Sequence, residues 1–286
     1  MRPVFEWNLG SRVITLGKRT LLMGVVNVTP DSFSDGGLYL DPEKAVEHGL
    51  KLLDDGADLL DIGGESTRPG AKASVTEAIE LERVIPVIRS IKAKRSSATL
   101  SIDTYKAAVA RAAVEAGAEI VNDVSAFRWD AKMPKTIAEL KCGAILMHMR
   151  GRPDEWRNLP PVGDIVTLVK RELGVWTDAA ALAGVKRERM MIDPGFGFGK
   201  NFEENYPLLR RLEEFHQLRY PIAVGVSRKS FVGRMVARAG VDAPVQERHY
   251  GTVAAEVAAI LKGAQVIRTH DVRASHDAAR VADVAA

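Results

Sequence analysis

Short apolar segments alternate with longer amphipathic segments along most of the chain. Four apolar segments begin within two residues of a Gly-Ala pair, at residues 59–62, 120–123, 145–148 and 266–270. Four others lack this pair, at residues 21–28, 100–103, 190–193 and 222–225. Each has the length of a strand buried on both faces, as in a parallel sheet. The glycine of each pair is the residue type that ends a helix in the left-handed conformation.

Helices are predicted between these eight strands. One begins at Asp41-Pro42, with aspartate as the cap and proline in the first turn. The others cover residues 74–94, 105–115, 162–182, 203–218 and 253–262. Strands that alternate with helices form parallel units of an α/β fold. Eight such units favour a closed (β/α)8 TIM barrel, and an open, doubly wound sheet is the alternative.

The first twenty residues follow a different pattern. Residues 4–8 and 12–16 flank Leu9-Gly10-Ser11, which predicts a β-hairpin that closes the bottom of the barrel. We therefore expect a hairpin over residues 1–20 and a barrel over 21–286, together forming a single domain. The length of 286 residues suits a barrel, which needs roughly 250.

The composition argues against several classes of protein. The net charge is only +3, and the basic residues are scattered, which argues against nucleic-acid binding. No apolar run reaches the ~18 residues of a membrane span, and the first ten residues lack the apolar core of a signal peptide. The single cysteine, Cys142, excludes an intrachain disulfide and a cysteine-based metal site. These features predict a soluble, cytoplasmic protein.

Polar side chains stand where the predicted strands end. In a parallel barrel all these ends open onto one face, where barrel enzymes keep their active sites. Each residue taken singly can instead cap a helix or order a loop, but a barrel does not need a polar residue at almost every strand end. The polar residues at strand ends are Asn27, Asp61, Asp103, Asn122, Asp123, Asp193, Ser227, Arg268 and His270.

The segments after several strands carry a second signal. Residues 29–37, 63–70 and 194–200 are rich in glycine, serine and proline, and the first and third also contain phenylalanines. They are either plain surface turns or loops that close over a ligand. Ser227-Arg228-Lys229-Ser230 begins a helix, and helix starts favour anions. The regions after strands seven and eight are the common phosphate site of barrels.

These segments resemble the dihydropteroate synthase family, in the same order along the chain. The motifs that carry the resemblance are residues 24–37, 61–70, 101–104, 122–125, 193–200, 227–230 and 268–272. The resemblance extends from about Leu21 to Val272. It implies a homodimeric (β/α)8 transferase of folate biosynthesis that depends on Mg²⁺. Such an enzyme condenses 6-hydroxymethyl-7,8-dihydropterin pyrophosphate with p-aminobenzoate to give 7,8-dihydropteroate and pyrophosphate.

The resemblance also implies roles for individual residues. For pterin binding it implies Asp103, Asn122, Val124, Met147, Asp193, Lys229 and Arg268. For pyrophosphate it implies Asn27, Arg268 and His270, with Asn27 also the Mg²⁺ ligand. For p-aminobenzoate it implies Phe33, Thr67, Arg68, Pro69, Phe198 and Ser227. The catalytic set is Asn27, Asp103, Asp193, Lys229, Arg268 and His270.

A dissociative reaction fits these roles. The C–O bond to pyrophosphate would break first, and Asp103 and Asp193 would lie near the resulting pterin methyl cation. Sulfonamides are expected to bind in the p-aminobenzoate pocket. Three alternatives stay open: a pterin-binding methyltransferase domain, an aldolase with Lys229 as Schiff-base nucleophile, and a non-catalytic paralogue.

Overall fold

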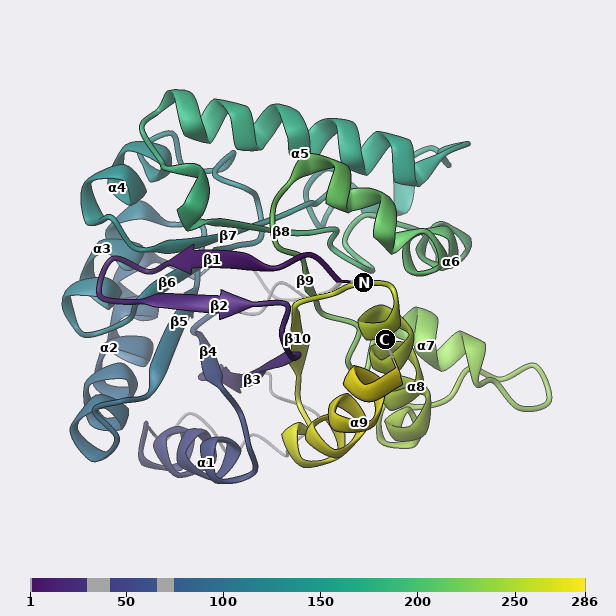
Figure 1. Ribbon diagram of the computed structural model, residues 1–286, viewed down its shortest axis with the longest axis horizontal. Helices are drawn as coiled ribbons and strands as arrows, with labels where there is room; N and C mark the ends of the chain where they lie inside the picture. Colours follow the sequence, from purple (N-terminus) through teal and green to yellow (C-terminus); the bar gives the residue numbers. More distant parts are fainter. Residues whose placement is uncertain (1, 30–41, 66–74, 286) are drawn as a thin grey trace.

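Eight parallel strands form a closed barrel in the computed structural model, which describes residues 2–29, 42–65 and 75–285 (Figure 1). Neighbours in the sheet follow chain order from β3 to β8, and β10 lies between β9 and β3. A parallel bridge between Ile192 and Ile222 closes the ring. The (β/α)8 prediction is confirmed, and the open-sheet alternative is wrong. The strands are β3 (Leu21–Asn27), β4 (Leu59–Gly63), β5 (Thr99–Asp103), β6 (Ile120–Asp123), β7 (Gly143–Met147), β8 (Met190–Asp193), β9 (Ala223–Val224) and β10 (Val266–Thr269).

Helices surround the barrel (Figure 1). The α-helices are α1 (Pro42–Asp54), α2 (Glu77–Lys94), α3 (Ala107–Glu115), α4 (Met133–Leu140), α5 (Ile165–Leu182), α6 (Phe202–Arg210), α7 (Ser230–Met235), α8 (His249–Leu261) and α9 (Val272–Ala285). The 3-10 helices are η1 (Trp156–Asn158), η2 (Arg187–Arg189), η3 (Leu212–Leu218) and η4 (Val245–Glu247). Among the described residues, no helix has the length and apolar character needed to cross a membrane.

Several predicted helix limits differ from the observed ones. Neither α4 nor α9 was predicted from the sequence, and residues 203–218 were predicted to form one helix. The structure instead has α6 followed by η3, because the backbone leaves the helical region at Arg211, where φ is −113°. Helix α2 begins three residues later than predicted, where the side chain of Thr76 accepts a hydrogen bond from the backbone N–H of Ile79 at 3.4 Å.

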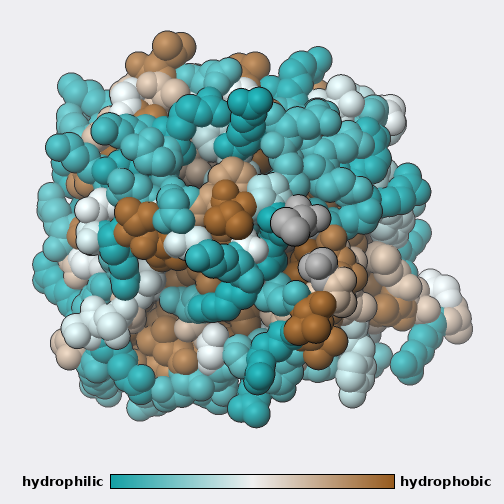
Figure 2. Space-filling view, viewed as in Figure 1, coloured by the Kyte–Doolittle hydropathy of each residue, from teal (hydrophilic) through white to brown (hydrophobic). Residues whose placement is uncertain are grey.

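The predicted hairpin is present and closes the amino-terminal end of the barrel. Strands β1 (Phe5–Asn8) and β2 (Val13–Leu16) pair in antiparallel register and lie across that end in Figure 1. Trp7, Leu9 and Leu16 are buried in one cluster with the inward-facing residues that begin the barrel strands. In Figure 2 this face is largely hydrophilic, with apolar patches over the hairpin and beside α9. The carboxyl ends of the strands are therefore free to form a site at the opposite end.

The Gly-Ala pattern has two different physical causes. Gly56, Gly117 and Gly263 adopt positive φ values of 106°, 119° and 95°, as expected for glycines that end helices. At Gly143 the prediction is wrong, because Lys141 takes the left-handed position with φ 54°. Gly143 instead permits close packing, since a Cβ atom there would lie 2.5 Å from Leu9 Cδ2.

Substituting Gly143 with alanine should therefore loosen the contact between hairpin and barrel. We expect the free energy of unfolding to fall by about 1–3 kcal/mol, the usual cost of overpacking a core. Urea unfolding measures this change. Gly163→Ala is the matched control, because nothing lies within 4 Å of its added Cβ. Equal stability of the two variants would contradict the packing role of Gly143.

Candidate active site

Arg268 at the end of β10 connects side chains from three other strands. Its Nε donates to Asp61 Oδ2 at 2.7 Å, and its Nη2 donates to Asp103 Oδ2 at 3.0 Å. Asn122 Nδ2 donates to the same Asp61 oxygen at 2.9 Å. Asp61 lies on β4, Asp103 on β5 and Asn122 on β6. Asp103, Asn122 and Arg268, which were predicted from separate motifs, thus meet around Asp61 at the carboxyl end of the barrel.

Asp61 is the central acceptor of this network, and sequence reasoning gave it no specific role. It is fully buried, and among the described residues its Oδ1 has no hydrogen-bond partner. A buried carboxylate is tolerated only when it is paired and hydrogen-bonded. The signal was present in the sequence, because Asp61 interrupts an apolar strand that is buried along its whole length.

Burial sets the charge state of two further carboxyl groups. Burial, together with the negative charge of Asp61, raises the pKa of Asp103 to about 7, although the charge of Arg268 opposes the shift. Burial also raises the pKa of Asp193, at the end of β8. The backbone N–H of Gly195, which donates to Asp193 Oδ1 at 2.7 Å, counteracts this shift together with the charge of Lys229. Asp193 and Lys229 therefore act on each other electrostatically.

The segment after β8 is held in place by Lys200. Its buried ammonium donates to the carbonyl oxygens of His148, Gly195 and Phe198 at 3.2, 2.7 and 3.2 Å. Gly195 has φ 68°, and a Cβ atom there would lie 1.8 Å from the carbonyl oxygen of His148, so this path requires glycine. Burial lowers the pKa of Lys200 well below its ordinary value. The role of Lys200 was not predicted.

This segment brings Phe198 against Lys229. The Lys229 Nζ lies 3.8 Å from the centroid of the Phe198 ring, a cation–π contact. Lys229 directly precedes α7 and occupies its N-cap position. The residue expected to bind the pterin and the residue expected to bind p-aminobenzoate are therefore neighbours.

An apolar cluster adjoins these polar groups. Val124, Met147 and Met149 are buried within it. Four partly buried aromatic residues pack against them, namely Tyr105, Trp129, Trp156 and Phe198. The rings of Trp156 and Phe198 meet edge to face with centroids 5.8 Å apart. Such a surface suits a flat ring whose edge is bound by the neighbouring carboxylates.

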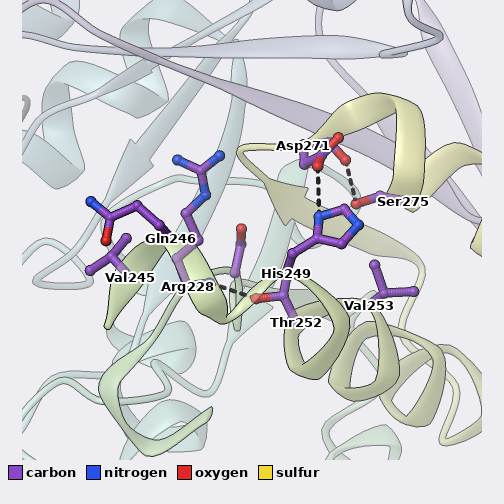
Figure 3. A pocket seen from close by; sticks show the side chains of 9 residues that line it. Arg228, Val245, Gln246, His249, Thr252, Val253, Asp271 and Ser275 are labelled. Atoms are coloured by element: carbon purple, nitrogen blue, oxygen red, sulfur yellow. Dashed lines mark hydrogen bonds and ion pairs between the residues drawn. The ribbon is translucent and has the colours of Figure 1, made fainter. Parts of the chain in front are cut away.

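Ser227 and His270 form a second polar group at the ends of β9 and β10. His270 Nδ1 lies 3.0 Å from Ser227 Oγ, and the backbone N–H of His270 donates to the same oxygen at 3.2 Å. Ser227 also lines a cavity of about 260 Å³, which Figure 3 shows from close by. There His249 faces Asp271, with Nδ1 2.9 Å from Asp271 Oδ2.

An unpredicted ion-pair cluster lies at the base of the segment after β4. Lys106 pairs with both Glu65 and the buried Glu80 of α2, and the hydroxyl of Tyr105 donates to Glu65 at 3.1 Å. Burial lowers the pKa of Lys106, but its bonds to the two glutamates outweigh this effect and raise it. The cluster holds Glu65 in position at this end of the barrel.

Five further residues were predicted to belong to the site. Asn27 ends β3 and is partly exposed. Phe33, Thr67, Arg68 and Pro69 lie outside the described residues. Within the described ranges, no three His, Cys, Asp or Glu side chains are grouped to hold a metal ion.

Comparison with known proteins identifies the family. The model of the pterin-binding enzymes matches residues 23–270. Dihydropteroate synthase of Clostridium beijerinckii is 43% identical over 277 residues, which is 96% of this chain and 98% of that protein. The solved Xanthomonas albilineans dihydropteroate synthase with 4-aminobenzoic acid has a TM-score of 0.88 and 44% identity, covering 100% of this chain and 98% of that one.

A second solved structure agrees with the first. The Yersinia pestis dihydropteroate synthase in complex with a sulfonamide drug has a TM-score of 0.88 and 40% identity, covering 95% of this chain and 96% of that one. Both the sequence match and the structural match extend over nearly the whole barrel. The chain therefore belongs to the pterin-binding enzymes, in the dihydropteroate synthase family.

Proposed function

We propose that this chain condenses 6-hydroxymethyl-7,8-dihydropterin pyrophosphate with p-aminobenzoate, giving 7,8-dihydropteroate and pyrophosphate. The observation that carries the proposal is the network at the carboxyl end of the barrel, in which Arg268 bonds Asp103 and Asp61 while Asn122 bonds Asp61. Family membership and the 4-aminobenzoic acid of the Xanthomonas relative support it.

The pterin edge is proposed to bind Asp103, Asn122, Asp193 and Lys229. A pterin presents adjacent N–H donors and acceptors, and a carboxylate can accept two N–H bonds from one edge. Asn122 donates one amide N–H to Asp61, so its orientation is set and its amide oxygen can face the ligand. Val124 and Met147 offer apolar contact to the ring faces.

The pyrophosphate is proposed to bind Arg268 and His270. A guanidinium has five N–H donors, and the bonds to Asp61 and Asp103 use two of them. The others can bind phosphate oxygens, for which the planar fork is suited. Ser227 holds the ring of His270 at this position.

Asn27 is proposed as the protein ligand of Mg²⁺. Magnesium prefers oxygen ligands and is commonly held by one or two protein groups together with waters and substrate phosphates. The amide of Asn27 at the end of β3 fits such a partial site. When bound, the ion would neutralise negative charge on the pyrophosphate.

The p-aminobenzoate is proposed to lie between Phe198 and Ser227. Phe198 offers a ring face beside Lys229, and Ser227 offers a hydroxyl for the carboxylate. Phe33, Thr67, Arg68 and Pro69 complete the pocket in this proposal. Sulfonamides carry a similar aryl amine and should compete for the same pocket, which agrees with the sulfonamide complex of the Yersinia relative.

The arrangement supports a dissociative reaction. The C–O bond breaks with its electron pair leaving on pyrophosphate, and Arg268 and His270 stabilise that charge. The pterin methyl cation left behind lies near Asp103 and Asp193. The weakly nucleophilic amine then attacks the cation, forms the C–N bond and loses a proton. No covalent bond to Lys229 is required, so borohydride should trap no adduct there.

A direct assay tests this function. The protein is incubated with the dihydropterin pyrophosphate, p-aminobenzoate and Mg²⁺, and dihydropteroate and pyrophosphate are quantified. Equal molar amounts of both products are expected, and excess sulfonamide should suppress both. Absence of both products would favour a non-catalytic paralogue.

Lys229→Ala should weaken pterin binding by about 10- to 100-fold, because a hydrogen bond from a charged donor contributes roughly 1.5–3 kcal/mol. Titration with 6-hydroxymethylpterin measures the change. Lys262→Ala is the control, since Lys262 is 41% exposed and pairs with Glu213 on the outer surface. Unchanged affinity in Lys229→Ala would show that the pterin site is misplaced.

The assembly and location are also proposals. We propose a cytoplasmic homodimer in which hairpin and barrel form a single domain over residues 1–286. The shared cluster of hairpin and strand residues supports the single domain. Sedimentation equilibrium tests the dimer, and a mass of one chain at micromolar concentration would contradict it.

A further inference from the structure

A buried cluster of hydrogen-bonding side chains lies behind the strand end that carries Arg268 and His270. It joins Glu256 of α8, Thr269 of β10 and Ser275 of α9, none more than 2% exposed. Ser275 Oγ lies 2.6 Å from Glu256 Oε2 and 2.8 Å from Thr269 Oγ1. We call these three residues the Glu256 cluster. It takes no part in the proposed chemistry, so its presence needs another explanation.

The Glu256 cluster holds the turn that contains His270. Ser275 Oγ lies 2.8 Å from the carbonyl oxygen of Asp271, and the backbone N–H of Asp271 donates to Thr269 Oγ1 at 3.3 Å. His270 lies between these two anchored residues. Its ring is held from the other side by Ser227. The position of His270 therefore depends on hydrogen bonds on both sides of it.

Arg268 depends on the same strand end. Successive side chains of a strand point to opposite faces, and Arg268 reaches Asp61 and Asp103 inside the barrel while Thr269 reaches Ser275 of the outer helix layer. The hydroxyl of Thr269 thus anchors the backbone on the face opposite to the guanidinium.

Counting protons shows which form of Glu256 completes the cluster. Ser275 has one hydroxyl proton but contacts two acceptors, the Glu256 carboxyl group and the Asp271 carbonyl oxygen. If Glu256 carries a proton, it can donate to Ser275, which then donates to Asp271, while Thr269 donates to the second lone pair of Ser275. If Glu256 is ionised, Ser275 must donate its proton to Glu256, and the hydrogen bond from Ser275 to the carbonyl oxygen of Asp271 is lost.

The surroundings of Glu256 favour the protonated form. Burial, together with the charge of Asp271, raises the pKa of Glu256 to about 7, although the hydroxyls of Ser275 and Thr269 oppose the shift. Asp271 is in turn paired with His249, at the start of α8. Among the described residues, Glu256 Oε1 has no hydrogen-bond partner, which is unfavourable for a buried charge.

We propose that protonated Glu256, acting through Ser275 and Thr269, positions Arg268 and His270 for the departing pyrophosphate. This inference rests on the proposed function, because it assigns the pyrophosphate to those two residues. Glu256 is a positioning residue, since it reaches the site only through its neighbours.

Binding of inorganic pyrophosphate in the presence of Mg²⁺ tests the proposal. Glu256→Leu and Thr269→Val should each weaken it by about tenfold, the loss expected for one hydrogen bond. Affinity for 6-hydroxymethylpterin, which lacks the pyrophosphate, should change less than about twofold. Thr177→Val is the matched control, because Thr177 is 1% exposed and bonds a backbone carbonyl of α5. This substitution also removes a buried threonine hydroxyl, but one on α5 that takes no part in the Glu256 cluster.

Glu256→Gln separates the positioning role from simple loss of stability. Glutamine keeps a donor at every pH, so this variant should bind pyrophosphate as the unmodified protein does at pH 6. At pH 8.5 it should bind more tightly than the unmodified protein, whose Glu256 is then ionised. Binding as weak as that of Glu256→Leu at pH 6 would overturn the role of the protonated form.

His270→Ala distinguishes failure of this inference from failure of the proposed function. If His270→Ala weakens pyrophosphate binding but Glu256→Leu and Thr269→Val match Thr177→Val, the inference is wrong and the anion site stands. If His270→Ala has no effect, the proposed anion site itself is wrong.

Discussion

Arg268→Met should lower turnover by about 100- to 1,000-fold, the effect typical of removing a preorganised electrostatic group. It should also destabilise the fold. Arg268 is the cation that pairs with Asp61 and Asp103. Without it, Asp61 becomes a buried carboxylate whose remaining described partner is Asn122. Breaking a buried pair from one side costs about 3–5 kcal/mol. Urea unfolding and the product assay measure the two effects.

A second substitution separates the two roles of Arg268. Adding Asp61→Asn to Arg268→Met removes the uncompensated charge, so much of the stability should return. Turnover should stay low, because the cation that faces the pyrophosphate is still missing. Recovery of both properties would mean that Arg268 serves only the fold. Wild-type stability in the single variant would contradict the buried ion-pair network.

Asp103 should give the reaction an acidic limb near pH 7. Its pKa is raised to about 7, mainly by burial, so the ionised form that stabilises the pterin cation is lost as the pH falls. We expect Asp103→Asn to lower kcat by about 100- to 1,000-fold. The residual activity should no longer follow this limb. A pH profile of kcat/KM for both proteins, which reports the ionisation of groups in the free enzyme, measures the change.

Stability should change with pH in the opposite direction to activity. The pKa of Asp103 is higher in the folded than in the unfolded protein, so the folded state holds a proton that the unfolded state has lost. This contribution to stability is present at low pH and disappears as the pH rises through about 7. Asp103→Asn should weaken the pH dependence of unfolding. If the activity of Asp103→Asn still fell as the pH dropped below about 7, the pH dependence of the reaction would belong to another group.

The architecture was predictable because it depends on repeated local patterns. Each barrel strand is a short apolar run, and eight such runs with helices between them admit few arrangements. The hairpin was also recognisable, since two short runs flank Leu9-Gly10-Ser11. Its function as a plug depends on Trp7, which is 1% exposed. Periodicity alone does not distinguish this buried position from an exposed one.

Contacts between distant segments were not predictable in the same way. Gly143 was read as a helix stop, but the reason for glycine is Leu9, more than 130 residues earlier. Asp61 was noticed as a polar strand end, but its role depends on Arg268, which the sequence places 207 positions away. Lys200 is an ordinary lysine in the sequence, and its three carbonyl partners become visible only in the folded chain.

The candidate residues were selected mainly because they stand at or soon after strand ends, where a barrel can gather side chains from distant parts of the chain. Asp103, Asn122 and Arg268 are brought into one network, and Lys229 meets Phe198. What the sequence did not provide was the pairing among them. Arg268 was expected to bind ligand alone, whereas it also neutralises two carboxylates.

The location of bound product tests the account most directly. A crystal structure of the protein with 7,8-dihydropteroate should place the pterin against Asp103, Asn122 and Asp193, with its aryl ring beside Phe198. Product bound at the hairpin end of the barrel, or away from Arg268, would contradict the account.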